Sequence, residues 1–147
     1  MAYKVDFEAA DVQWQIEVLK DFPHIAGKRF IPAMKRAVAD LRKEIEPTIP
    51  VRSGVGKSAF QDKVSGKGLN LKGRVGFGPQ GWHMNIAEYG ARAHGMGYIP
   101  NLKVRIDMHP GIAPRKFMEQ GFARTKGRID QEMDQAADQV VQDLAVK

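Results

Sequence analysis

The sequence predicts an α+β fold, with an antiparallel sheet of about three to four strands, one long helix before it and one long C-terminal helix after it. Apolar residues recur at helical spacing in residues 24–46 and again in residues 114–145. Residues 48–112 are instead rich in glycine and contain stretches in which apolar and polar residues alternate. The whole chain, residues 1–147, has the length of one ordinary domain.

The N-terminal segment, residues 1–23, precedes the first long helix. Its apolar residues at helical spacing are Val12, Ile16 and Leu19. This spacing predicts a short helix that Phe22 and Pro23 interrupt, because proline breaks a helical pattern.

The first long helix, residues 24–46, is predicted from an amphipathic pattern. Its apolar face consists of Phe30, Ile31, Met34, Val38, Leu41 and Ile45. Pro32 predicts a kink or a start near Phe30, since its ring removes a backbone N–H and clashes with the preceding turn. Pro47 and Pro50 are expected to end the helix.

The middle of the chain is predicted to be extended. Residues 58–64 and residues 69–77 both alternate, and the glycine-containing turn at residues 65–68 joins them into a β-hairpin. Residues 101–108 alternate in the same way and predict a further strand. The glycine-rich residues 90–100 between them are expected to form a mobile loop.

The stretch GVGKS in this region resembles a nucleotide-binding P-loop. In the pattern G-x-x-x-x-G-K-[ST] the first glycine would fall at position 51, which is Val51 here. A β-branched residue resists the backbone conformation that cradles phosphates. A helix and two prolines precede the stretch instead of a buried strand, so we do not expect a nucleotide-binding site.

The last helix, residues 114–145, begins at Pro114, which is favoured at a first helical position. Its apolar stripe is Met118, Phe122, Thr125, Ile129, Met133, Ala136, Val140 and Leu144. Gly121 and Gly127 are expected weak points that cost roughly 1 kcal/mol each against alanine.

Charges are segregated along this helix. The basic residues Arg115, Lys116, Arg124, Lys126 and Arg128 come early, and the acids Asp130, Glu132, Asp134, Asp138 and Asp143 come late. This order opposes the helix dipole, which favours acids at the start. Either an external partner compensates for it, or a long surface helix tolerates it.

Composition limits the classes of function. The chain has no cysteine, no apolar run near 18 residues and no signal-peptide pattern, so we expect a soluble protein made in the cytoplasm, with no disulfide and no membrane partner. The net charge is +6, and residues 48–106 alone contain nine Lys or Arg against two acids, which leaves +7. Such a basic segment fits nucleic acid, an acidic protein or simply a solvated surface.

Candidate catalytic residues are few. His24, His83, His94 and His109 do not form a helical metal-binding pair, although His94 and His109 could meet across the glycine loop. Glu88 has no second carboxylate for acid–base work. We therefore expect no catalysis, cofactor or metal, and a small hydrolase with a His/Glu site is the weakest alternative. Three aromatic residues are candidates for base stacking, or for core and subunit contacts: Trp82, Tyr89 and Tyr98.

Three motifs in order resemble a known family. They are "PTIPVRSGVGKSAF", "IAEYGARAHG" and "HPGIAPRKFMEQGF", and with the helix before them they cover most of the chain from Phe30 onward. This arrangement is similar to the neck or tail-completion (head–tail joining) proteins of long-tailed double-stranded DNA bacteriophages. The chain departs from the family pattern at Ala91, where a threonine is usual, and at Lys116 and Gly121, where prolines are usual.

The resemblance implies a structural virion protein that forms a homo-oligomeric ring at the head–tail junction. Its implied partners are copies of itself, adjacent head-completion and tail proteins, and, without sequence specificity, the DNA in the channel. The alternative is a small basic nucleic-acid-binding protein that acts alone. The basic residues expected to face DNA or a partner are Arg52, Lys57, Lys63, Lys67, Arg92 and Arg105. The motif positions expected to be structural are Gly54, Glu88, Gly90, Pro110, Gly111, Pro114 and Phe117.

Overall fold

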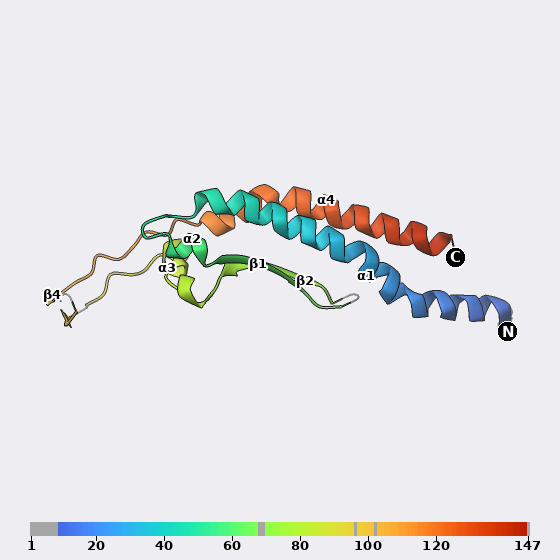
Figure 1. Cartoon of the computed structure of the whole chain (residues 1–147), viewed down its shortest axis with the longest axis horizontal. Helices are drawn as coiled ribbons and strands as arrows, with labels where there is room; N and C mark the ends of the chain where they lie inside the picture. The colour runs from blue at the N-terminus through green and yellow to red at the C-terminus, as the bar shows by residue number, and fades with distance from the viewer. Residues whose placement is uncertain (1–8, 68–69, 96, 102, 147) are drawn as a thin grey trace, which may run out of the picture. The chain divides into compact units, whose positions relative to one another are not determined.

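The structure is a computed structural model that describes residues 9–67, 70–95, 97–101 and 103–146. It confirms the α+β class, with a long helix α1 (Ala9–Ile45) before the strands and a long helix α4 (Phe117–Ala145) after them (Figure 1). The prediction for the start of the N-terminal segment, residues 1–8, lies outside the described residues.

The prediction of a single sheet of three to four strands is wrong. The chain has two separate antiparallel pairs, β1 (Phe60–Ser65) with β2 (Lys72–Phe77) and β3 (Gly97–Ile99) with β4 (Val104–Ile106). The predicted hairpin at β1–β2 is therefore confirmed. The helices η2 (Pro79–Gly81) and α3 (Met84–Tyr89) lie between the two pairs along the chain.

Short helices interrupt the predicted extended middle, residues 48–112. They are η1 (Glu46–Thr48), α2 (Val55–Ser58), η2 (Pro79–Gly81) and α3 (Met84–Tyr89). The strand predicted at residues 58–64 begins two residues later, at Phe60, because the hydroxyl of Ser58 donates to the carbonyl of Val55 at 2.9 Å and closes the helical turn. The expected loop at residues 90–100 contains β3.

Helix α1 is continuous where a break was predicted. Pro23 and Pro32 both lie inside it, and the helix bends in its N-terminal part (Figure 1). An internal proline costs about 3 kcal/mol. The apolar face continues past both prolines, since Ile25, Ala26 and Ala33 are buried, and this packing offsets the lost hydrogen bonds.

Contacts divide the chain into two compact units. Unit 1 comprises the described residues of Met1–Val38, Lys63–Arg74 and Gly127–Lys147, and unit 2 comprises Ala39–Asp62 and Val75–Lys126. Each unit has a core of its own.

In unit 1, α1 packs against the second half of α4. Ile25 and Ala26 form a cluster with Val140, and the small residues Ala33 and Ala136 are also buried. Small side chains let two helix backbones approach closely, so these alanines explain the tight pairing. At the edge of the pair, ion pairs join Arg29 to Asp143 at 2.7 Å and Arg36 to Glu132 at 2.9 Å.

The core of unit 2 is built from α1, β1, α3 and α4. Its buried members are Ile45, Ile49, Phe60, Met84 and Phe117. The ring of Phe77 lies 5.1 Å from that of Phe60 and 6.1 Å from that of Phe117, measured between centroids, within the range of favourable aromatic pairs. Helix α4 is thereby fixed to the β1–β2 hairpin at its first residue.

The predicted stripe on α4 is wrong at two points. The helix begins at Phe117, three residues after Pro114, and Phe122 is 48% exposed. Gly121 is buried in place of Phe122, and Thr125 is buried as predicted, because the contact face follows Phe117 at steps of four residues. Gly121 is more than a weak point, since an added Cβ there would meet the side chain of Ile45.

Candidate partner-binding surface

The six basic candidates are all exposed, and they occur in both units. Lys63 and Lys67 belong to unit 1, and the other four belong to unit 2. Within unit 2, Arg52 borders a hollow of about 320 Å³ together with Arg115 and His83. Each unit therefore presents basic side chains to solvent.

The GVGKS stretch forms the single-turn helix α2 and not a phosphate loop. A 3-10 helix and a bend precede it, and Gly54 starts it with a φ of 81°. Gly56 is buried, and a Cβ at this position would lie 2.9 Å from the Cγ of Met84. The glycine is thus required for packing against α3, and the geometry supports the rejection of a P-loop.

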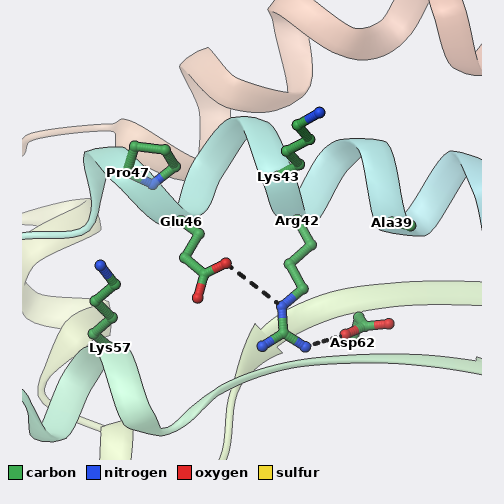
Figure 2. A pocket seen from close by; sticks show the side chains of 7 residues that line it. All are labelled: Ala39, Arg42, Lys43, Glu46, Pro47, Lys57 and Asp62. Carbon is green, nitrogen blue, oxygen red and sulfur yellow. Dashed lines mark hydrogen bonds and ion pairs between the residues drawn. The ribbon is translucent and has the colours of Figure 1, made fainter.

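Lys57 projects from this turn toward a hollow of about 490 Å³ beside the end of α1. Figure 2 shows Arg42 between two acids in this hollow, while Lys43 points away from them. Arg42 donates a hydrogen bond to Asp62 and lies 3.9 Å from Glu46. The hydrogen bond to Asp62 raises the pKa of Arg42 above its ordinary value.

Arg42, Asp62 and Glu46 in this hollow are therefore engaged with one another. Arg42 also lies over the ring of Phe60 at 5.9 Å, so the guanidinium links the last turns of α1 to β1. These contacts of Arg42 hold the end of α1 against β1 within unit 2. They do not leave a carboxylate free to act as a general base.

Glu88 has a structural contact that the sequence did not reveal. Its side chain is 5% exposed, and its two oxygens accept hydrogen bonds from the backbone N–H of Met118 at 2.9 Å and of Glu119 at 3.0 Å. The first N–H groups of a helix have no partner within the helix, and an anion there also favours the helix dipole. Glu88 therefore caps α4 although it lies 30 residues before the first capped N–H group in the sequence. Capping motifs span only a few residues, so no such motif could predict this cap.

Two glycines form a close crossing just beyond this cap. Ala91 and Ile112 exchange backbone hydrogen bonds of 2.9 and 2.8 Å. A Cβ on Gly90 would lie 2.5 Å from the carbonyl oxygen of Ile112, and one on Gly111 would lie 2.5 Å from that of Ala91. Both glycines also have positive φ, so this crossing admits no other residue without strain.

From this crossing extends a two-stranded arm, which consists of the described residues of 91–112. Backbone bridges join Ala91 to Ile112 and His94 to His109, and β3 pairs with β4 beyond them. In Figure 1 the label β4 marks the far end of this extended pair of segments. Within residues 90–100, where a loop was expected, the described part of the chain contains β3 and the two bridges at Ala91 and His94. The mobility of this segment stays a prediction.

Large apolar side chains on the arm face solvent. Tyr98 is 61% exposed and Met108 is 64% exposed, and Val104 and Ile112 are exposed as well. Of the other candidate stacking aromatics, Trp82 and Tyr89 are also exposed, so their interpretation as core residues is wrong. Their role in subunit contacts stays a prediction.

His94 and His109 do meet, as the sequence suggested. Their rings stack with centroids 5.3 Å apart. The Nδ1 atom of His94 lies 2.8 Å from the carbonyl oxygen of Arg92, and Nδ1 of His109 accepts the N–H of Gly111 at 3.0 Å. One nitrogen of each ring is thus engaged by backbone, and in the described part of the chain no three potential metal ligands gather at one point.

Comparison of the chain with protein-family models, with curated proteins and with solved structures found no match. Among the described helices, none combines the length and the apolar character needed to cross a membrane.

Proposed function

We propose that the chain is a structural, ring-forming subunit at the head–tail junction of a long-tailed bacteriophage, where it joins the head to the tail. The observation that carries the proposal is the order and spacing of three motifs, "PTIPVRSGVGKSAF", "IAEYGARAHG" and "HPGIAPRKFMEQGF". The virion location, the homo-oligomeric ring and the neighbouring head-completion and tail proteins all belong to this proposal.

The places of the motif residues support a structural role. Gly54 starts a helical turn, Glu88 caps α4, Gly90 and Gly111 allow the crossing at the base of the arm, and Phe117 lies in the core of unit 2. Each contact shapes the backbone or fixes a helix. Motifs with these contacts suit an assembly protein better than an enzyme, whose motif residues would converge on reacting groups.

The surface supports a protein that works in contact with others. Exposed apolar residues on the arm lie next to basic ones, and contiguous apolar surface on a soluble protein often marks an interaction site. The basic candidates are spread over both units, which suits weak and sequence-independent contact with DNA that must slide past.

Paired assays separate this proposal from a nucleic-acid-binding protein that acts alone. We expect the isolated chain to bind duplex DNA no tighter than about 10⁻⁴ M at physiological salt, the weak end of non-specific binding. Replacement of Lys57, Lys67 and Arg92 by alanine should impair the joining of heads to tails in vitro. The matched control replaces three lysines of α1, Lys20, Lys35 and Lys43, and should join normally.

A stand-alone binder would give the opposite pattern. It must neutralise several phosphates by itself, so its affinity would reach the sub-micromolar range and fall steeply with added salt. Sub-micromolar binding by the natural chain, together with normal joining by the triple variant, would overturn the head–tail proposal.

A further inference from the structure

The arm is a two-stranded sheet without a covering partner among the described residues. An isolated pair of strands is only marginally stable in water, and both its edges present backbone groups that can pair with another chain. Its register places Tyr98 opposite Arg105 and Ile99 opposite Val104. Exposed apolar surface and unpaired strand edges together indicate that the arm binds another protein surface.

The charge of the arm restricts the kind of partner. Residues 91–112 contain three basic side chains, Arg92, Lys103 and Arg105, against the single acid Asp107. Arg105 pairs with Asp107 at 3.0 Å, but both side chains are more than three-quarters exposed, so solvent screens this pair. An acidic surface with some apolar character would complement the arm.

The second half of α4 offers such a surface on the same chain. Residues 129–145 contain five acids and no Lys or Arg. Helix α1 engages two of these acids, Glu132 and Asp143, in unit 1. Asp134 and Asp138 are exposed and have no ion-pair partner in the part of the chain that the structure describes, and Val141, on the next turn, is 65% exposed.

Each surface carries two like charges at neighbouring positions. Asp134 and Asp138 lie one helical turn apart, about 6 Å along the axis. Arg105 lies in β4, and Lys103 lies in the turn that leads into this strand, with a φ of 50°. The arm therefore offers two positive charges close together, with the exposed ring of Tyr98 opposite Arg105, as a complement to two acids and an exposed valine on the helix.

We propose that the arm of one copy of this chain docks on the Asp134–Asp138–Val141 face of α4 in a second copy. The inference rests on the proposed ring and names the surfaces that would build it. Because the two surfaces differ, the contact is head-to-tail, and such contacts generate rings when the rotation closes.

Charge reversal tests the inference by complementation. The arm variant is Lys103→Glu with Arg105→Glu, and the helix variant is Asp134→Lys with Asp138→Lys. Sedimentation velocity of the full chain should show self-association of the natural protein and about 100-fold weaker association of each variant alone, because like charges then face each other. A mixture of the two variants should associate again, since each supplies the surface that the other lacks.

The controls separate this contact from other effects. Reversal of two exposed lysines of α1, Lys20→Glu with Lys35→Glu, should leave association unchanged, and circular dichroism should show that all variants are folded. Docking of the arm on the α4 of its own chain would not be restored by mixing. Failure of the mixture to associate, unchanged association of either variant, or a natural chain that stays monomeric would each overturn the inference.

These outcomes differ from a failure of the proposed function. If the natural chain forms a ring that the reversals do not affect, the surfaces named here are wrong and the head–tail proposal is untouched. If the complementation succeeds but the chain does not support head–tail joining, the interface stands and the proposed function is wrong.

Discussion

The cap that Glu88 places on α4 leads to a prediction with a calculable size. Glu88→Gln keeps the shape of the side chain but replaces one carboxylate oxygen by an NH₂ group. One backbone N–H, of Met118 or Glu119, then faces a donor and loses its acceptor. A hydrogen bond to a charged group contributes about 1.5–3 kcal/mol. The lost charge at the helix start adds about 0.3–1 kcal/mol, so the variant should lose roughly 2–4 kcal/mol.

Urea unfolding of the natural and variant chains measures this difference. The matched control is Glu119→Gln, in the same turn of α4, because the side chain of Glu119 is exposed and forms an exposed ion pair with Lys116 at 3.4 Å. An exposed pair contributes about 0–1 kcal/mol, so the control should change little. Equal stability losses in Glu88→Gln and Glu119→Gln would show that the buried cap does not stabilise α4.

Other substitutions test the packing and the ion pair between helices. Phe117→Ala should cost about 3–5 kcal/mol as a large core truncation, whereas Phe122→Ala, on the exposed side, should cost less than about 1 kcal/mol in the same denaturant experiment. Gly121→Ala should destabilise by about 1–3 kcal/mol because its Cβ has no room, and Gly127→Ala, with open space around it, should stabilise by up to about 1 kcal/mol; the reverse order would contradict the contact face of α4. The hydrogen bond to its arginine partner lowers the pKa of Asp143, so its contribution is present above the unfolded-state pKa and is lost as the pH falls through the folded-state value. Thermal melts should therefore show Asp143→Asn less stable than the natural chain at neutral pH, with the difference shrinking as the pH falls through the lowered pKa of Asp143, and a difference independent of pH would refute this.

The long helices were predictable because their signal is periodic over many residues. The pattern in residues 24–46 and 114–145 placed both helices, and the alternation around β1 and β2 placed the hairpin. The prediction for the start of α1 was wrong because it treated the prolines as ends of the helix. Local rules count the hydrogen bond that Pro23 removes, but they do not include the packing of the flanking turns against α4.

The arm and the cap depend on contacts that local patterns do not contain. Glu88 is separated from the N–H groups it accepts by 30 and 31 residues, and the crossing of Gly90 with Gly111 joins positions equally hard to pair from sequence. The short strand β3 lies in a stretch whose glycines are typical of a loop. The segregated charges of α4, in contrast, were visible in the sequence, and the structure shows that α1 compensates for only part of them.

Electron microscopy of phage particles tests the central claim most directly. Particles of a phage that encodes this chain would be purified and labelled with a gold-conjugated antibody against it. The account predicts label at the head–tail junction of tailed particles, and free heads with separate tails when a nonsense codon interrupts the gene. Complete, infectious particles that lack both the label and the protein would contradict it.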